Sequence, residues 1–253
     1  MDFADKEIRR LERRKFRKDK PKSRIENRIR DKIPKGLSDK LTSAFTSAFK
    51  LLIEKGTSVI TKTYDKEGIE TELDVYTYLF EKSKTKRNWK RLNSKGNRRR
   101  LIDSAVTAFE GALPGLLGIG LPDIPLFTAF ILRGVYETAL TYGFDCDKKE
   151  ERYFALKLIE GAMLSGEAQQ TVVRSIKRTA RLIAAGDTDS FDLDAQLRKT
   201  SHVLSEAMIA AKFIQGIPIV GVVGGAYNLT AYRRITGFAR REYQLRYLYK
   251  VRK

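Results

Sequence analysis

The sequence has very few of the residues that build disulfides, metal centres and common catalytic sites. Its 253 residues include one cysteine, Cys146, and one histidine, His202. A single cysteine excludes an internal disulfide, and with a single histidine it argues against a structural zinc site. The GxSxG, Walker A, HExxH and GxGxxG patterns are also absent. We therefore assign no catalytic residue, no metal and no cofactor.

A secretory signal peptide is also absent from the start of the sequence. The first twenty residues, MDFADKEIRRLERRKFRKDK, lack the apolar core that such a signal requires. We therefore expect the bulk of the protein to be intracellular.

Two long stretches contain almost no charge. Residues 111–132 carry one charged residue, Asp123, and residues 213–232 carry none. Runs of this length are candidate transmembrane helices. Glycines and prolines interrupt both, however, and these residues weaken or kink a helix. The pattern predicts helix, apolar break and helix in each stretch, although full spanning by both stays open. The candidate membrane contacts are Leu116, Leu117, Ile119, Leu121, Ile217, Ile219, Val220 and Val222.

Positive charge gathers beside these stretches in the chain. The net charge is +19. Lys and Arg exceed Asp and Glu by 12 in residues 1–132 and by 7 in residues 213–253, whereas residues 133–212 are balanced. Lys and Arg near an anionic bilayer contribute about 1 kcal/mol each to its binding. This arrangement favours contact with an anionic membrane face.

The most basic segment, residues 82–100, also holds the only tryptophan. It contains ten Lys or Arg residues and no acid. An aromatic residue among basic ones is typical of single-strand nucleic-acid binders and of membrane interfaces alike. The position of the segment just before the first apolar stretch favours the membrane. The candidate anionic-lipid or polyanion contacts are Lys84, Lys86, Arg87, Trp89, Lys90, Arg91, Arg98, Arg99 and Arg100.

Three ionisable residues lie in apolar sequence. Asp123 is inside the first stretch, and Arg133 and Glu137 are in the helix expected after it. The four-residue spacing of Arg133 and Glu137 permits a salt bridge on one helical face. An acid in an apolar setting can have a raised pKa and serve as a general acid or base. A hydrolase or lipid-modifying enzyme is therefore an alternative function.

Helical periodicity dominates the rest of the chain and predicts an all-α helical bundle. Apolar residues recur at three and four positions after residue 36, after residue 166 and after residue 191. We expect a basic N-terminal arm or helix at residues 1–35 and a helical domain at residues 36–253, with a basic insert or linker at residues 82–100. The two apolar stretches share one plan, two Gly/Pro-broken helical hairpins, which indicates a weak internal pseudo-repeat.

Four segments carry a resemblance to a known family. They are KIPKGLSDKLTSAF (32–45), EGALPGLLGIGLPDIPLF (110–127), TYGFDCDKKEERYFALKLI (141–159) and QGIPIVGVVGGAYNLTAYRRITGFARREYQLRYL (215–248). With these segments the sequence resembles the EcsC family over about residues 30–250. The resemblance implies a bacterial protein akin to one encoded beside the EcsA and EcsB components of an ABC transporter. It supplies no catalytic residue.

Taken together, these features predict a membrane-associated, non-enzymatic accessory or regulatory protein on the cytoplasmic face of the cell membrane, peripheral or monotopic. The expected partners are the anionic membrane surface and an ABC transporter or another membrane protein. Non-specific nucleic-acid binding through residues 1–35 and 82–100 is a further alternative. So is a soluble helical domain that buries both stretches in its core. The sequence does not predict an oligomeric state.

Overall fold

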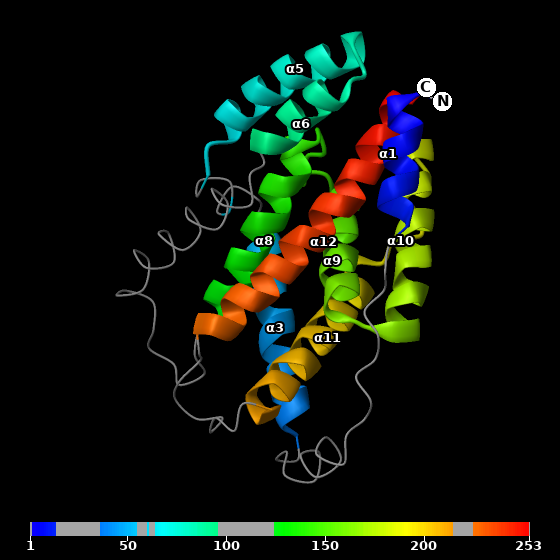
Figure 1. Ribbon diagram of the computed structural model, residues 1–253. Coiled ribbons are helices and arrows are strands. Elements are labelled where there is room, and N and C mark those ends of the chain that lie inside the picture. Colours follow the sequence, from blue (N-terminus) through cyan, green and yellow to red (C-terminus); the bar gives the residue numbers. More distant parts are fainter. Residues whose placement is uncertain are drawn as a thin grey trace.

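The computed structural model describes residues 2–13, 36–54, 60, 64–95, 124–214 and 225–252. Within these ranges the chain forms nine helices and no strand, which confirms the predicted all-α fold class. The helices are α1 (Phe3–Glu12), α3 (Leu37–Glu54), α5 (Lys66–Lys82), α6 (Lys86–Lys95), α8 (Ile124–Thr141), α9 (Lys149–Met163), α10 (Gly166–Ala185), α11 (Leu193–Ile214) and α12 (Gly225–Val251) (Figure 1).

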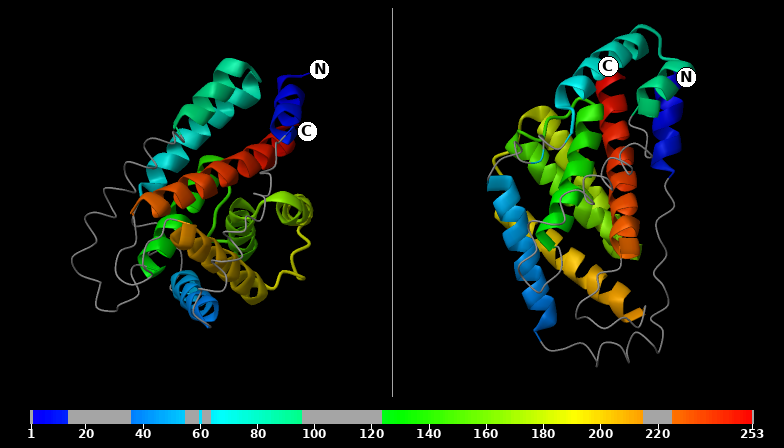
Figure 2. Two further views of the ribbon diagram at one scale, coloured as in Figure 1. Left: turned by 60° about the horizontal axis from the view of Figure 1, so that its bottom comes forward. Right: turned by 90° about the vertical axis from the view of Figure 1, so that its left-hand side faces the viewer.

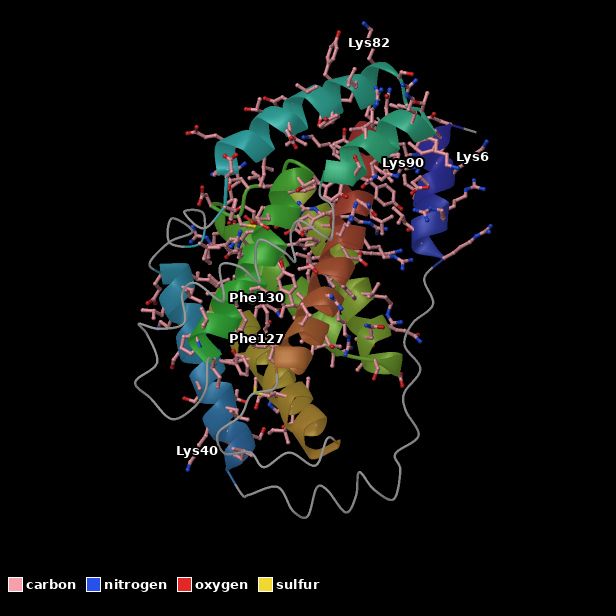
Figure 3. All side chains as sticks on the ribbon, turned by 60° about the vertical axis from the view of Figure 1, so that its left-hand side comes forward. Lys6, Lys40, Lys82, Lys90, Phe127 and Phe130 are labelled. Atoms are coloured by element: carbon pink, nitrogen blue, oxygen red, sulfur yellow. The ribbon has the colours of Figure 1, made fainter. Side chains whose placement is uncertain are left out.

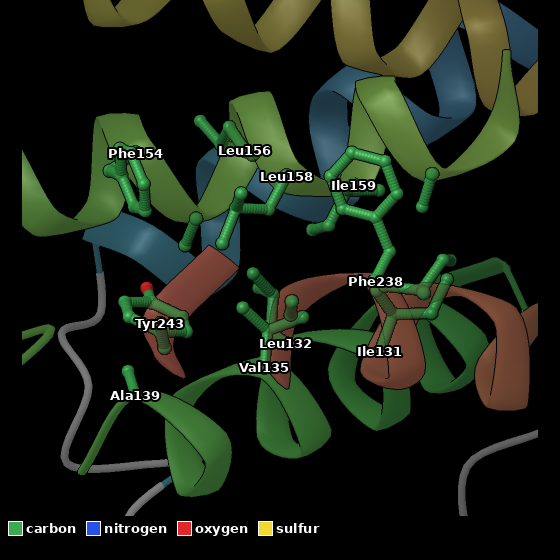
Figure 4. Packing of buried hydrophobic residues seen from close by; sticks show 14 of the residues in the cluster. Ile131, Leu132, Val135, Ala139, Phe154, Leu156, Leu158, Ile159, Phe238 and Tyr243 are labelled. Atoms are coloured by element: carbon green, nitrogen blue, oxygen red, sulfur yellow. The ribbon is translucent and has the colours of Figure 1, made fainter. Parts of the chain in front are cut away.

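Helix α8 is buried because its sequence is apolar on every side. Its only charged residues are Arg133 and Glu137, and every residue from 131 to 140 is buried. A helix that is hydrophobic all round belongs in the interior of a bundle. Helices α3, α5, α9 and α12 pack on it. Figure 4 shows the core between α8, α9 and α12, which includes Ile131, Leu132, Val135, Ala139, Phe154, Leu156, Leu158, Ile159, Phe238 and Tyr243.

Helix α9 is the second interior helix. Residues 154–159 are buried without interruption, and α10, α11 and α12 pack around them. Helix α10 ends at Gly186, whose φ of 76° closes the last turn through its backbone N–H and the carbonyls of Ile183 and Leu182. A left-handed residue at this position is a common helix end, and glycine adopts it without a steric penalty.

Helices α8 and α12 run side by side in the same direction. In the middle of α8, Phe130 and Gly134 lie against Tyr232 in the first third of α12. Beyond the end of α8, the hydroxyl of Tyr142 accepts a hydrogen bond of 3.1 Å from Nε2 of Gln244, late in α12. Each apolar stretch precedes one of these helices in the chain, so both stretches lead into the same end of the bundle (Figures 1 and 2).

Helices α5 and α6 form a hairpin at the other end of α8. The side-chain amide of Asn88 donates to the carbonyls of Leu79 and Ser83 at 2.9 and 3.0 Å and holds the two helices together. The hydroxyl of Tyr142 donates to Oδ1 of Asn93 at 2.5 Å, which places α6 at the C-terminal end of α8. An α-helix rises 1.5 Å per residue, so about 27 Å of α8 separates this contact from Ile124.

The basic helix α6 and the entry into α8 are therefore neighbours in the sequence and not in space. The expectation that positive charge lies beside the first apolar stretch came from chain order alone. In the described ranges the length of α8 separates α6 from Ile124, and residues 96–123 lie outside the described residues.

The central parts of both apolar stretches, residues 111–123 and 215–224, lie outside the described residues. No helix within the described ranges combines the length and the apolarity that crossing a bilayer requires.

Candidate functional site

Helix α1 is short, and its faces have different chemistry. Ala4, Ile8 and Leu11 are buried and follow the helical spacing. Asp2 caps the helix by accepting a hydrogen bond of 2.6 Å from the backbone N–H of Phe3. A ten-residue helix is marginal by itself in water, so α1 depends on the contacts that hold it to the bundle.

The carboxylate of Glu7 joins α1 to α6. Its Oε1 accepts a hydrogen bond of 3.0 Å from the indole Nε1 of Trp89, and both residues are buried. Arg10 binds the same carboxylate with two hydrogen bonds, of 2.5 and 2.8 Å. A buried tryptophan needs a partner for its N–H, and here the partner is an acid from another helix.

The end of α1 is tied to α10 and α12. Oε1 of Glu12 accepts hydrogen bonds of 2.9 Å from Nζ of Lys177 and 2.9 Å from the hydroxyl of Tyr249. The hydrogen bond from Lys177 is the main reason that the pKa of Glu12 lies below its ordinary value. Arg252 forms a salt bridge of 2.9 Å with Asp5. The acids of α1 thus bind the bundle.

With Ala4, Glu7, Ile8 and Leu11 buried, α1 exposes its cations, and the adjoining helices do the same. Contacts with Trp89 and Lys177 place α1 between α6 and α10 (Figures 1 and 2). We call the exposed cations of these three helices that form no salt bridge, with Arg13 at the end of α1, the α1–α6–α10 basic surface: Lys6, Arg9, Arg13, Lys86, Arg87, Lys90, Arg91, Arg174, Arg178 and Arg181. Arg10 is exposed as well but is paired with Glu7. Figure 3 shows Lys6 and Lys90 on neighbouring helices at this end of the molecule.

The cations of this surface lack a salt-bridge partner in the part of the chain that the structure describes. None of the ten forms a salt bridge with another residue of the described ranges. Helix α6 has no acid at all in its sequence, KRNWKRLNSK. The surface therefore presents positive charge that is available to an anionic partner.

The predicted contacts of residues 82–100 divide between this surface and the core. Lys86, Arg87, Lys90 and Arg91 are exposed on α6. Lys84 is partly buried, and its Nζ donates to the carbonyl of Val251 at 2.7 Å. The predicted contacts Arg98, Arg99 and Arg100 lie outside the described residues.

Trp89 is a core residue in this structure. Its side chain is 5% exposed and lies against the rings of Phe80 and Tyr247, with centroid distances of 5.3 and 6.2 Å. The sequence interpretation placed its ring at a headgroup or on a base, and neither can reach it while α1 is docked. Trp89 and Leu92 lie three positions apart and form the buried side of α6, which packs against α5 and α12 as well as α1.

Most cations of the C-terminal basic block bind groups within the protein. Arg234 donates to the carbonyl of Leu164 at 2.8 Å, Arg240 donates to the carbonyl of Asn93, and Arg241 donates to the carbonyl of Leu11. Arg246 forms a two-fold hydrogen bond of 2.6 and 2.7 Å with buried Glu151 and lies 4.0 Å from the ring centroid of Phe144. In the described ranges this block is mainly structural.

Arg133 and Glu137 form the salt bridge that their spacing predicts. Nε of Arg133 lies 3.1 Å from Oε1 of Glu137, and the two side chains are 8% and 4% exposed. Burial raises the pKa of Glu137, and the charge of Arg133 opposes that shift. The second carboxylate oxygen of Glu137 has no hydrogen-bond partner in the described structure.

The aromatic ring of Tyr232 lies beside this pair. It packs on Phe130 with a centroid distance of 4.0 Å and against the backbone of Gly134. The pKa of Tyr232 is raised, first by burial and then by the negative charge of Glu137. The third ionisable candidate, Asp123, lies outside the described residues, so the structure brings together two of the three. The pair is buried within the described structure, and its salt bridge lies within α8.

The eight predicted membrane contacts, residues 116, 117, 119, 121, 217, 219, 220 and 222, also lie outside the described residues. Their contact with lipid stays a prediction. Of the predicted site residues, the described structure therefore places Lys86, Arg87, Lys90 and Arg91 on the basic surface and joins Arg133 to Glu137.

A comparison with protein families gives one match, to the EcsC protein family, over residues 4–248 of the 253-residue chain. The match includes α1, which the sequence interpretation placed before the family domain. No curated protein and no solved structure matches the chain.

Proposed function

The chain belongs to the EcsC family, and we propose that it is a non-enzymatic accessory or regulatory protein that docks peripherally on the cytoplasmic face of the cell membrane. An ABC transporter, or another membrane protein, is the partner that the family resemblance suggests. The lipid contact in this proposal is the α1–α6–α10 basic surface.

The single observation that supports the proposal is the exposure of ten cations at three adjoining helices, none of which forms a salt bridge with a residue that the structure describes. Surface cations are ordinarily interspersed with acids, and a surface of one sign attracts a partner of the other. Each Lys or Arg close to an anionic bilayer contributes about 1 kcal/mol. Several cations on one surface are therefore sufficient for reversible attachment that depends on salt.

Nucleic acid is a polyanion too, but in the described ranges α1, α6 and α10 expose no large aromatic side chain, a feature that single-strand binders use. These proteins stack bases on exposed aromatic side chains. The one tryptophan of α6 is buried and bonded to Glu7. A bilayer requires no stacking platform, so the membrane is the better fit.

The proposal is tested by flotation with vesicles of neutral lipid and with vesicles rich in anionic lipid. One variant replaces Lys86, Arg87, Lys90 and Arg91 of α6 with glutamine. The control replaces four exposed cations away from the surface, Lys40, Lys149, Arg198 and Lys199, with glutamine. Each variant loses four positive charges, so a difference between them depends on where those charges lie on the molecule.

We expect the wild type to float with anionic vesicles only and to be released by salt. At about 1 kcal/mol per residue, the α6 variant should bind roughly a thousandfold more weakly, whereas the control should change about threefold or less. If the two variants lose equal affinity for anionic vesicles, the binding depends only on net charge, and the proposed surface is overturned. Tighter binding to a short DNA duplex than to vesicles would favour the nucleic-acid alternative.

A further inference from the structure

One face of α5 is exposed and differs from the rest of the surface. Glu67, Thr71, Asp74, Val75, Tyr78, Glu81 and Lys82 are all exposed. With 3.6 residues per turn, these seven positions fall within an arc of about 120°. Phe80 on the opposite side is the only fully buried residue of this 17-residue helix. We call the seven residues the α5 outer stripe.

The stripe is acidic in a strongly basic protein. Glu67, Asp74 and Glu81 form no salt bridge within the described ranges, and the net charge of the whole chain is +19. Lys82, the one cation of the stripe, lies over the ring of Tyr78 at 5.6 Å from its centroid. The stripe therefore offers negative charge on a molecule whose net charge is strongly positive.

The stripe also contains the two most exposed large hydrophobic side chains of the described ranges. Tyr78 is 62% exposed and Val75 is 53% exposed, and they are neighbours three positions apart on the helix. Single exposed apolar residues need no explanation, but an apolar pair beside acids is typical of a protein contact. Most helical stability comes from packing an amphipathic face, and α5 buries little against its own chain.

The α5 outer stripe lies on the same helical hairpin as the α6 part of the basic surface. Helix α5 packs on α6, whose exposed cations belong to that surface, and the two helices form one hairpin. If α6 contacts an anionic bilayer, α5 lies close to that bilayer, yet its acids are repelled by the lipid itself. The cytoplasmic segments of integral membrane proteins that flank the bilayer are rich in Lys and Arg.

We propose that the α5 outer stripe binds a Lys/Arg-rich amphipathic helical segment of a membrane protein, at the cytoplasmic side of the bilayer. The proposal rests on the proposed membrane function for its location. The acids Glu67, Asp74 and Glu81 pair with the cations of the segment. Val75 and Tyr78 pack on its apolar residues, in the manner of a helix laid along an amphipathic face.

The test measures binding of a fluorescent basic amphipathic peptide, with Leu at helical spacing and Lys elsewhere, by anisotropy without lipid. One variant carries Glu67→Gln, Asp74→Asn and Glu81→Gln, and a second carries Val75→Ser and Tyr78→Ser. The acid control carries Asp187→Asn, Asp189→Asn and Asp194→Asn, all exposed elsewhere, and the apolar control carries Leu51→Ser, which is 47% exposed on α3.

We expect each stripe variant to bind the peptide at least about tenfold more weakly than the wild type, and each control to match the wild type. A peptide with Glu in place of Lys should not bind. Equal affinity of wild type and stripe variants would overturn the proposal. So would a wild type that sediments as a dimer and becomes monomeric in the stripe variants, because a second copy of the chain would then cover the stripe.

Flotation separates this proposal from the membrane function. Stripe variants should float with anionic vesicles as well as the wild type does, since their basic surface is intact. If the wild type binds the peptide but never floats with vesicles, the stripe still binds basic helices. Its proposed location at the bilayer is then overturned.

Discussion

The indole nitrogen of Trp89 on α6 lies 3.0 Å from a carboxylate oxygen of Glu7 on α1, and this buried hydrogen bond joins two residues that are 82 positions apart in the chain. It fixes α1 beside α6 and so assembles two of the three parts of the basic surface. The stability of the basic surface therefore depends on the Glu7–Trp89 hydrogen bond, which is buried beneath that surface.

Trp89→Phe removes the hydrogen-bond donor and keeps most of the aromatic packing. A hydrogen bond to a charged group contributes about 1.5–3 kcal/mol, so we expect a loss of about 2 kcal/mol in the free energy of unfolding, measured with urea. Tyr78→Phe, at an exposed ring, should leave that free energy unchanged. A loss below about 0.5 kcal/mol for Trp89→Phe would show that the hydrogen bond adds little.

Acid should loosen α1 through Glu12. The pKa of Glu12 is lowered in the folded protein from an ordinary value of 4.5, chiefly by Lys177. Its contribution to stability is therefore complete at pH values above 4.5 and is lost as the pH falls through the lower, folded value. The emission of Trp89, which reports on α1, should shift to the red over that interval. Glu12→Gln should already be loosened at neutral pH and should lack this part of the shift.

The buried pair of α8 should respond differently to single and double substitutions. Glu137→Leu leaves Arg133 buried without its partner and should cost about 3–5 kcal/mol of unfolding free energy. Arg133→Met combined with Glu137→Leu removes both charges, and the double variant should be close to the wild type or more stable. Urea denaturation measures the free energy of unfolding of the wild type, the two single variants and the double variant, which together form a double-mutant cycle. Equal destabilisation by the double and the single variants would contradict this account.

Two glycines on facing helices should give opposite results when changed to alanine. A Cβ at Gly134 would lie 2.5 Å from Cε2 of Tyr232 and 2.7 Å from Cγ2 of Thr236, so Gly134→Ala should force α8 and α12 apart and cost about 1–3 kcal/mol. At Gly237 of α12 a Cβ meets nothing within 4 Å. Gly237→Ala should therefore stabilise the protein by about 0.5–1 kcal/mol. Thermal unfolding tests this, since the melting temperature should fall in Gly134→Ala and rise in Gly237→Ala relative to the wild type.

The helices of this fold could be predicted because their apolar spacing is local information. The run from residue 37 to residue 54 and the run from residue 166 to Gly186 show the helical period and are observed as α3 and α10. The Arg133–Glu137 salt bridge was predictable for the same reason, since both residues lie on one helix.

Contacts between distant segments could not be predicted in this way. The sequence of α6 suggests a tryptophan among solvated cations, because nothing in the segment itself shows that Glu7 will bind the indole. The arginines of α12 likewise look like a surface cluster, whereas Arg240, Arg241 and Arg246 bind Asn93, Leu11 and Glu151. Each of these partners lies at least 90 residues away in the chain, beyond the reach of any periodic pattern.

The salt bridge of 2.9 Å between Asp5 and Arg252 brings the first and last helices of the chain to one corner of the molecule, next to the cations of α1 (Figure 1). An affinity tag or fluorescent protein fused at either extremity would consequently be held over the same neighbourhood, where its bulk could shield the lysines and arginines from vesicles. Attachment assays should thus be run on protein from which such fusions have been cleaved, and a defect seen only with a fusion should be credited to the added domain.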